Sequence, residues 1–256
     1  MPLLSLQQIS FSYSSHLLFE DLSFSLAQND FLGILGTNGC GKSTLLKLMA
    51  GILKPSQGEV CFQNKKLSQY SAQEKARSIA MLSQEVQSDF PFRVLEVVLM
   101  GRFPYIGRFS WENKKDMEIA RYSLSLVDAL HLEKRILTEL SGGEKQRVFL
   151  AQALAQAWGQ KNQVLLLDEP LTHLDLKHQI ELCELLKKLH QEKDYTLVVV
   201  LHDLHFASKL CSRLLMLKGG KVKVDAVPSE ALNEKNIREV FDLKADLMPN
   251  IYGQVF

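Results

Sequence analysis

The 256-residue sequence lacks several features that would place it in other classes of protein. Its longest apolar runs, such as Val164–Leu167 and Leu197–Leu201, are strand-sized and far too short to span a bilayer. Its 4 cysteines show no metal or redox spacing, so we expect free thiols in a reducing cytosol. The N-terminus has no basic region before an apolar stretch, so we expect no signal peptide. The formal net charge of +1 gives no global field toward nucleic acid or acidic lipid.

A glycine-rich stretch, Gly33–Met49, fits the pattern G-x-x-x-x-G-K-[ST]. The apolar run Phe31–Leu35 before it predicts a buried strand, and the leucines after it are spaced as in a helix. Backbone amides of such a loop and the N-terminus of the following helix favour phosphate oxygens. Lys42 is predicted to reach the β- and γ-phosphates and Ser43 to ligate Mg²⁺. The residues predicted to line a bound nucleotide here are Gly36, Thr37, Asn38, Gly39, Cys40, Gly41, Lys42, Ser43 and Thr44. Small-molecule kinases, GTPases and motors also carry this loop.

Two adjacent acids follow a second buried strand. Val164–Leu167 is apolar and leads into Asp168 and Glu169, which places both carboxylates at the C-terminal edge of a sheet, where ligands of open α/β sheets bind. Asp168 is predicted to hold Mg²⁺, and Glu169 to orient and deprotonate the attacking water. A strand that simply ends in a polar turn is the alternative interpretation.

The pattern along the chain predicts an α/β fold. Alternation at Leu4–Ile9 and Leu22–Leu26 indicates antiparallel strands near the N-terminus. Strands predicted at 164–168, 196–201 and 214–217 alternate with helices at about 174–191 and 205–211, which favours a mostly parallel sheet. The segment from Val94 to about residue 160 is mostly helical. We therefore predict one domain over 1–256, with a helical subdomain at about 86–160 inserted in the α/β core.

A third motif, Leu140-Ser-Gly-Gly-Glu-Lys-Gln-Arg147, opens a long predicted helix. Ser141 and Glu144 have the spacing of a capping box, and the amides of Gly142 and Gly143 offer a second phosphate-binding helix start. With this motif the sequence resembles the nucleotide-binding subunit of an ABC transporter, whose signature is LSGGQ followed by a basic residue and Q-R; Glu144 is a common variant of its fifth residue. The resemblance covers Tyr13 to about Lys221 and implies a P-loop NTPase core that binds ATP and Mg²⁺.

The resemblance assigns further residues. Tyr13 matches the aromatic residue that stacks on adenine, and Gln84 the glutamine that touches Mg²⁺ and relays to the transmembrane partner. Asp175 matches the aspartate that crosses the dimer interface, and His202 the histidine that holds the γ-phosphate. Leu171 departs from the small polar residue usual at its position. Two pairs of histidines lie close in the sequence, His202 with His205 and His173 with His178. A metal site at these pairs is not expected, because no cysteine or third ligand follows at a usual spacing.

The resemblance also implies protein partners and a cellular location. ATP bound at Gly36–Thr44 of one subunit is expected to be covered by Ser141–Gly143 of another in a homodimer. Integral membrane permease subunits would carry the solute, with a solute-binding protein acting through them and no nucleic acid involved. The expected location is the cytoplasmic face of the inner membrane, through docking of the helical block on the permease.

The run Val94–Gly107 resembles the V-x-M-G-R-x-P-x-x-G run found in the ATP-binding subunits of importers for iron–siderophore, haem and cobalamin. Importers of zinc, manganese or molybdate and an exporter subunit are alternatives. An ABC ATPase acting on nucleic acid or ribosomes, and a small-molecule kinase, are distant ones.

Cys40 lies in the glycine loop just before the predicted helix. A helix N-terminus and an adjacent lysine both stabilise a thiolate, which predicts a lowered pKa for Cys40. We expect its alkylation to stop hydrolysis and MgATP to slow the labelling.

Overall fold

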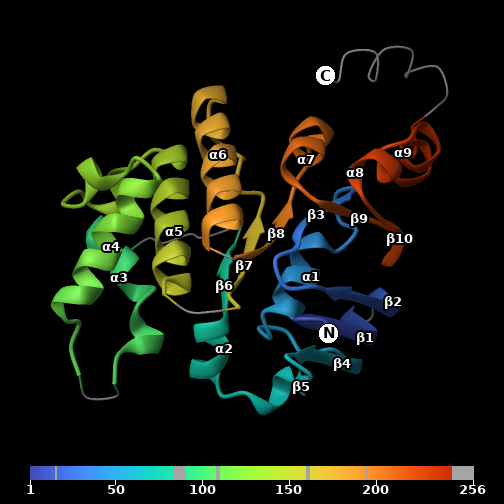
Figure 1. Cartoon of the computed structure of the whole chain (residues 1–256), viewed down its shortest axis with the longest axis horizontal. Helices are drawn as coiled ribbons and strands as arrows, with labels where there is room; N and C mark the ends of the chain where they lie inside the picture. Colours follow the sequence, from blue (N-terminus) through green and yellow to red (C-terminus); the bar gives the residue numbers. More distant parts are fainter. Residues whose placement is uncertain (15, 84–89, 108–109, 160–161, 194, 244–256) are drawn as a thin grey trace. The chain divides into compact units, whose positions relative to one another are not determined.

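A computed structural model describes residues 1–14, 16–83, 90–107, 110–159, 162–193 and 195–243 (Figure 1). The chain divides into two compact units. Unit 1 comprises residues 1–67 and the described chain from residue 198 onward, and unit 2 comprises residues 68–197. We describe each unit by itself.

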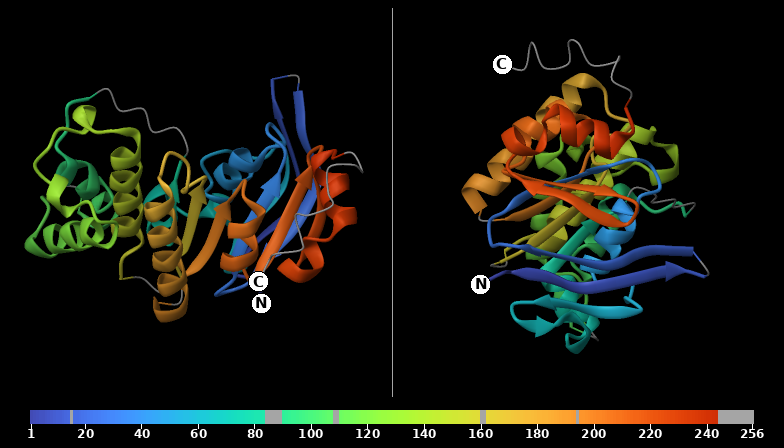
Figure 2. Two further views of the ribbon diagram at one scale, coloured as in Figure 1. Left: turned by 90° about the horizontal axis from the view of Figure 1, so that it is seen from above. Right: turned by 90° about the vertical axis from the view of Figure 1, so that its right-hand side faces the viewer.

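Unit 1 contains an antiparallel sheet with the strand order β2-β1-β4-β5. Its strands are β1 (Leu4–Tyr13), β2 (His16–Leu26), β4 (Gln57–Phe62) and β5 (Lys65–Lys66). Leu4 pairs with Leu26 on one side and with Phe62 on the other, and all three side chains are buried. The predicted N-terminal antiparallel strands are therefore present, and Figure 2 shows β1 and β2 running side by side.

The second sheet of unit 1 has the order β10-β9-β3-β8. These strands are β3 (Phe31–Gly36), β8 (Thr196–Val200), β9 (Arg213–Lys218) and β10 (Lys221–Ala226), and the boundary between the units falls within β8. Strand β3 pairs in parallel with β9, with Ile34 opposite Leu215, whereas β10 pairs antiparallel with β9. The helices of unit 1 are α1 (Lys42–Met49), α7 (Leu204–Leu210), α8 (Pro228–Ala231) and α9 (Glu234–Phe241). The sequence patterns missed β10, α8 and α9.

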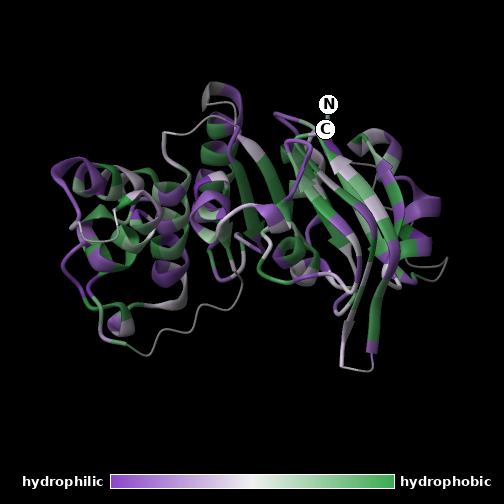
Figure 3. Cartoon of the chain, turned by 90° about the horizontal axis from the view of Figure 1, so that it is seen from below, coloured by the Kyte–Doolittle hydropathy of each residue, from purple (hydrophilic) through white to green (hydrophobic). Residues whose placement is uncertain are grey.

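Unit 2 is mostly helical. Its helices are α2 (Ala72–Ser78), α3 (Val94–Met100), α4 (Lys114–Leu126), α5 (Gly142–Ala157) and α6 (Leu176–Lys193), with short 3-10 turns at Phe103–Tyr105, Leu130–Leu132 and Leu137–Glu139. Strands β6 (Ile79–Leu82) and β7 (Val164–Asp168) pair in parallel. Helix α5 packs on α3 and α4, and both hydropathy colours alternate along these helices in Figure 3, as one buried face requires.

The Gly101–Tyr105 segment of unit 2 is held by buried polar contacts. A Cβ on Gly101 would lie 2.4 Å from the carbonyl oxygen of Gln152, so α5 approaches too closely for any side chain there. Arg102 pairs with Asp116 across 3.2 Å and donates to the carbonyl of Ala155 at 2.6 Å. The segment that suggests an iron-importer subgroup therefore fastens α3, α4 and α5 together.

No helix within the described ranges is both long enough and apolar enough to cross a bilayer.

Candidate nucleotide-binding site

The glycine loop of unit 1 connects β3 to α1, as the sequence predicts. Gly41 has a φ of +102°, and a Cβ there would lie 2.6 Å from the ring of Phe19. A Cβ on Gly36 would lie 2.5 Å from the carbonyl oxygen of Leu217. Only glycine fits either position, because Phe19 and the Leu217 carbonyl pack directly against the loop backbone.

Lys42 supplies a buried cation to this loop. Its side chain is 6% exposed, and its ammonium donates to the carbonyl oxygens of Gly36 at 2.9 Å and Thr37 at 3.1 Å. Lys42 is also the first residue of α1, whose N-terminus carries the positive end of the helix dipole. Ser43 and Thr44 follow in the same turn, so a cation, two hydroxyls and amide donors gather within one loop, which suits an anion of phosphate type.

The structure corrects the expectation for Cys40. Its side chain is 7% exposed and its Sγ lies under the loop, 2.8 Å from where a Cβ of Gly36 would stand. Burial raises the pKa of the thiol above its ordinary value, and this effect outweighs the lowering by Lys42. The predicted lowering of the Cys40 pKa was therefore wrong, because the prediction counted the helix and the lysine but could not count desolvation.

Tyr13 stands at the end of β1 beside the same loop. Its hydroxyl lies 3.4 Å from Oγ1 of Thr44, and its ring packs edge-on against Phe11 with centroids 4.9 Å apart. The side chain remains 47% exposed, so a face of the ring is available to a flat ligand such as a nucleobase.

His202 follows β8 in unit 1 and is exposed. The preceding residue, Leu201, donates its N–H to the carbonyl of Ile34 in β3 at 3.2 Å. The next residue, Asp203, caps α7 by accepting from the amides of His205 at 2.7 Å and Phe206 at 3.1 Å. These bonds place His202 at the end of the strand beside the one that enters the glycine loop.

Unit 2 carries the two adjacent acids. Asp168 ends β7 and is 1% exposed, while Glu169 is half-buried with a left-handed φ of +51°. Leu171, the departure noted in the sequence, is buried, so that position serves packing in this protein.

The capping box predicted at Ser141 is present at the start of α5. Oγ of Ser141 accepts from the amide of Glu144 at 3.3 Å, and the Glu144 carboxylate accepts from the Ser141 amide at 2.8 Å and its hydroxyl at 2.7 Å. The Ser141 hydroxyl and amide hold the pKa of Glu144 below its ordinary value, with smaller contributions from Arg135 and Arg147.

The start of α5 meets the loop after β7 within unit 2. A Cβ on Gly143 would lie 3.0 Å from the carbonyl oxygen of His173. Asp175 accepts a hydrogen bond from the His178 amide at 2.9 Å, and its Oδ1 lies 2.8 Å from Nδ1 of His178. The hydrogen bond from the His178 amide lowers the pKa of Asp175. An open hollow at this junction is lined by Ser141, Gly142, Gly143, Glu144, Arg147, His173, Leu174, Asp175 and His178. The structure thus brings the predicted signature residues and Asp175 to one surface.

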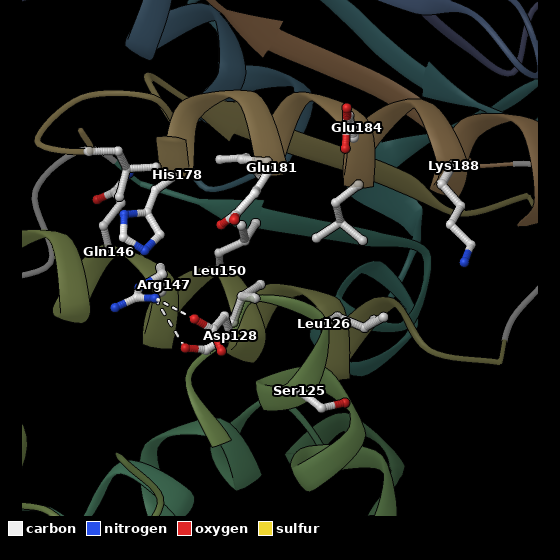
Figure 4. Close-up of a pocket in the computed structure, with 14 residues that line it drawn as sticks. Ser125, Leu126, Asp128, Gln146, Arg147, Leu150, His178, Glu181, Glu184 and Lys188 are labelled. Atoms are coloured by element: carbon white, nitrogen blue, oxygen red, sulfur yellow. Dashed lines mark hydrogen bonds and ion pairs between the residues drawn. The ribbon is translucent and has the colours of Figure 1, made fainter. Parts of the chain in front are cut away.

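A separate cavity of about 350 Å³ lies between α5, α6 and the end of α4 (Figure 4). Its floor includes Leu126 and Leu150, and at one end Arg147 donates to the Asp128 carbonyl at 3.0 Å. It shares Arg147, Leu174 and His178 with the hollow above and contains none of the predicted nucleotide residues.

Three polar residues near Glu169 were missed by the sequence reasoning: Gln146, Thr172 and Gln179. Each makes a side-chain hydrogen bond to the turn after β7. Gln146 lies in the α5 motif, Thr172 in the turn and Gln179 in α6. All three were visible in the sequence, but the partner of Gln146 lies 23 residues away. Gln84 lies outside the described residues. Among the residues that the structure does describe, no three histidine, cysteine, aspartate or glutamate side chains cluster as a metal site.

Comparison with known proteins gives consistent matches. The sequence profile of the ABC transporter family matches residues 19–172. The petrobactin import ATP-binding protein FpuC of Bacillus anthracis is 36% identical over 96% of this chain and 89% of its own. The hemin import ATP-binding protein HmuV of Hahella chejuensis is 40% identical over 91% of this chain and 90% of its own. The ferric enterobactin transport ATP-binding protein FepC of Escherichia coli is 35% identical over 93% of this chain and 86% of its own.

Solved structures agree in fold. An ABC transporter provisionally assigned to the metal-chelate type, in an inward-facing conformation, aligns with a TM-score of 0.80 at 33% identity, covering 95% of this chain and 90% of that one. A dimeric ATP-binding cassette bound to ADP and Pi aligns with a TM-score of 0.76 at 27% identity, covering 88% of this chain and 98% of that one.

Proposed function

This chain belongs to the ABC transporter family, as the motifs predicted, and from that premise we propose that it is the ATP-hydrolysing subunit of an importer for iron–siderophore, haem or cobalamin. The observation that carries the proposal is the presence in one chain of a glycine loop between β3 and α1 and of a capped, glycine-containing helix start at Ser141. The names of the hemin and ferric enterobactin relatives support the cargo class. The predicted α/β P-loop fold is confirmed by the structural neighbours.

We assign ATP binding first to the glycine loop. Backbone amides of Gly36–Thr44 and the ammonium of Lys42 would bind the phosphates, and Tyr13 would stack on the adenine. The fit rests on the position of the loop at the N-terminus of α1 and on the buried Lys42 ammonium, which donates to the carbonyls of Gly36 and Thr37.

Mg²⁺ would be held by Ser43, Gln84 and Asp168, an assignment that follows the family's motifs. The buried carboxylate of Asp168 is the hard oxygen ligand that this cation prefers. When bound, the ion would neutralise charge that develops on the phosphates.

Hydrolysis is assigned to Glu169 and His202. Glu169 would take a proton from the attacking water, whose oxygen bonds to the γ-phosphorus while the bond to ADP breaks. His202, exposed at the end of β8, would hold the γ-phosphate.

The complete site requires two copies of the chain. Ser141, Gly142, Gly143 and Glu144 of one copy would cover the nucleotide of the other, and Asp175 would cross the interface. Their gathering at one hollow of unit 2 supports a shared role in that contact. The dimeric neighbour bound to ADP and Pi supports the dimer. ATP would close it by binding the closed state more tightly than the open one.

The remaining partners follow from transport. We propose one domain over 1–256, whose helical subdomain at about 86–160 docks on membrane permease subunits at the cytoplasmic face of the inner membrane. A solute-binding protein would act through those permeases.

The hydrolytic role is tested by Glu169→Gln in the purified chain. The variant should bind ATP as the original protein does, accumulate as an ATP-bound dimer and lose nearly all turnover, because the phosphate loop is untouched. Glu184→Gln, an exposed change on α6, is the matched control and should leave turnover unchanged. Normal hydrolysis by Glu169→Gln would refute the assignment of Glu169 as the base.

The cargo is tested with the chain co-reconstituted in proteoliposomes with its permease and binding protein. ATP added on the side of the cassette should drive hemin or a ferric siderophore toward that side. Movement away from the cassette would identify an exporter.

A further inference from the structure

The turn that carries Glu169 is fastened by side chains from two helices. Nε2 of Gln146 in α5 donates to the carbonyl oxygen of Glu169 at 3.4 Å. Nε2 of Gln179 in α6 donates to the carbonyl oxygens of Leu171 at 3.2 Å and Leu174 at 3.1 Å. These bonds fix three carbonyls within the six residues from Glu169 to Leu174, which restricts the path of the turn.

The backbone at Glu169 needs such support. Its φ of +51° lies in the left-handed region, which is unfavourable for a residue with a side chain. A conformation of this kind persists where surrounding contacts determine it, and it is frequent at functional sites. The bonds from Gln146 and Gln179 are contacts of that sort, and the amide of Thr172 closes the turn on the Glu169 carbonyl at 3.2 Å.

Within the turn, the Thr172 hydroxyl meets the carboxylate. Its Oγ1 donates to Oε2 of Glu169 at 3.4 Å. This is long for such a bond, and catalytic hydrogen bonds of this length tighten when the reactants are in place. Thr172 is half-buried in the same turn, so the turn itself supplies this polar contact to the acid.

We propose that Thr172 is a positioning residue that holds the Glu169 carboxylate in the orientation needed to accept a proton from water. The inference rests on the proposed role of Glu169 as the base. Thr172 touches neither water nor phosphate in this proposal; it acts only through Glu169. The hydroxyl contacts one oxygen of the carboxylate, Oε2.

The test compares Thr172→Val, which keeps the shape and removes the hydroxyl, with Thr172→Ser, which keeps the hydroxyl. In the purified full-length protein, Thr172→Val should lower kcat roughly 10- to 100-fold, the value expected for losing a hydrogen bond to a charged group, while KM for ATP changes little. Thr172→Ser should recover most of kcat. Thr138→Val, an exposed change in unit 2, is the matched control and should leave kcat unchanged.

Three results would overturn the positioning role: a normal kcat in Thr172→Val, a loss that lies in KM, or equal loss in the valine and serine variants. If Thr172→Val does not fold, Thr172→Ala, compared with Thr172→Ser for kcat and for melting temperature, makes the same distinction. In the Glu169→Gln background, Thr172→Val should leave residual turnover unchanged, and a further drop of equal size would also overturn the proposal. Normal turnover in Glu169→Gln alone would instead reject the proposed base.

Discussion

The buried ion pair between Arg102 and Asp116 allows a quantitative prediction about unit 2. The guanidinium Nε lies 3.2 Å from Oδ1 of Asp116, and the two side chains are 7% and 6% exposed. Arg102 also lies with its Cζ 3.9 Å from the centre of the Tyr105 ring. The substitution Asp116→Ala would leave this charge buried with a carbonyl and a ring but no carboxylate.

The expected cost has two parts. Removing one partner of a buried pair costs about 3–5 kcal/mol, because the other charge stays desolvated. Oδ2 of Asp116 also accepts from the Asn113 amide at 3.2 Å in the capping box of α4, and losing that bond adds about 1 kcal/mol. The sum is about 4–6 kcal/mol, a large part of the stability of an ordinary domain.

Tryptophan fluorescence during urea unfolding measures this cost in unit 2. The chain has 2 tryptophans, Trp111 and Trp158, and both lie in this unit. Trp111 is 89% exposed, so a Trp111→Phe background leaves Trp158, which contacts Tyr122, as the probe. The unfolding midpoint should fall strongly in Asp116→Ala.

Two further variants test whether the loss of stability in Asp116→Ala comes from the unpaired buried charge. Glu118→Ala, an exposed change on the same helix, should shift the free energy of unfolding by less than about 0.5 kcal/mol. The double variant Arg102→Met with Asp116→Leu should be more stable than Asp116→Ala, because no charge is left buried. Equal midpoints for Asp116→Ala and Glu118→Ala, or a double variant no better than Asp116→Ala, would refute the reasoning.

Three other predictions concern the glycine loop and the helix start at Ser141. Lys42→Ala should weaken ATP binding itself, measured by equilibrium titration, and unchanged affinity would contradict the role of the cation. Ser141→Arg should bind ATP as a monomer but not close the dimer. A mixture of Ser141→Arg and Lys42→Ala should recover activity, because one of the two sites in a mixed dimer carries neither change. Normal hydrolysis by Ser141→Arg alone would reject the signature role. Because its pKa is raised, Cys40 should hold little thiolate at pH 7 and react with maleimide more slowly than the less buried Cys61, gaining rate as pH rises; peptide mass mapping would detect the opposite order.

Local patterns in the sequence were sufficient for the motifs. The glycine loop, the apolar strand before Asp168 and the capping box at Ser141 each depend on residues within a few positions of one another, and all three are present. Such features are set by backbone sterics, strand burial and helix-end hydrogen bonding, so the sequence alone determines them.

The contacts decided only by tertiary structure join residues distant in the chain or depend on burial. Asp116 meets Arg102 because α4 packs beside the turn that follows α3, and Gln146 reaches the Glu169 carbonyl because α5 lies beside the end of β7. Cys40 shows the same limit in its electrostatics, since the lysine beside it is visible in the sequence but the desolvation that raises its pKa comes from the packing around the loop. Spacing along a chain specifies which groups are near in sequence, whereas charge states and long-range hydrogen bonds depend on which surfaces the fold removes from water.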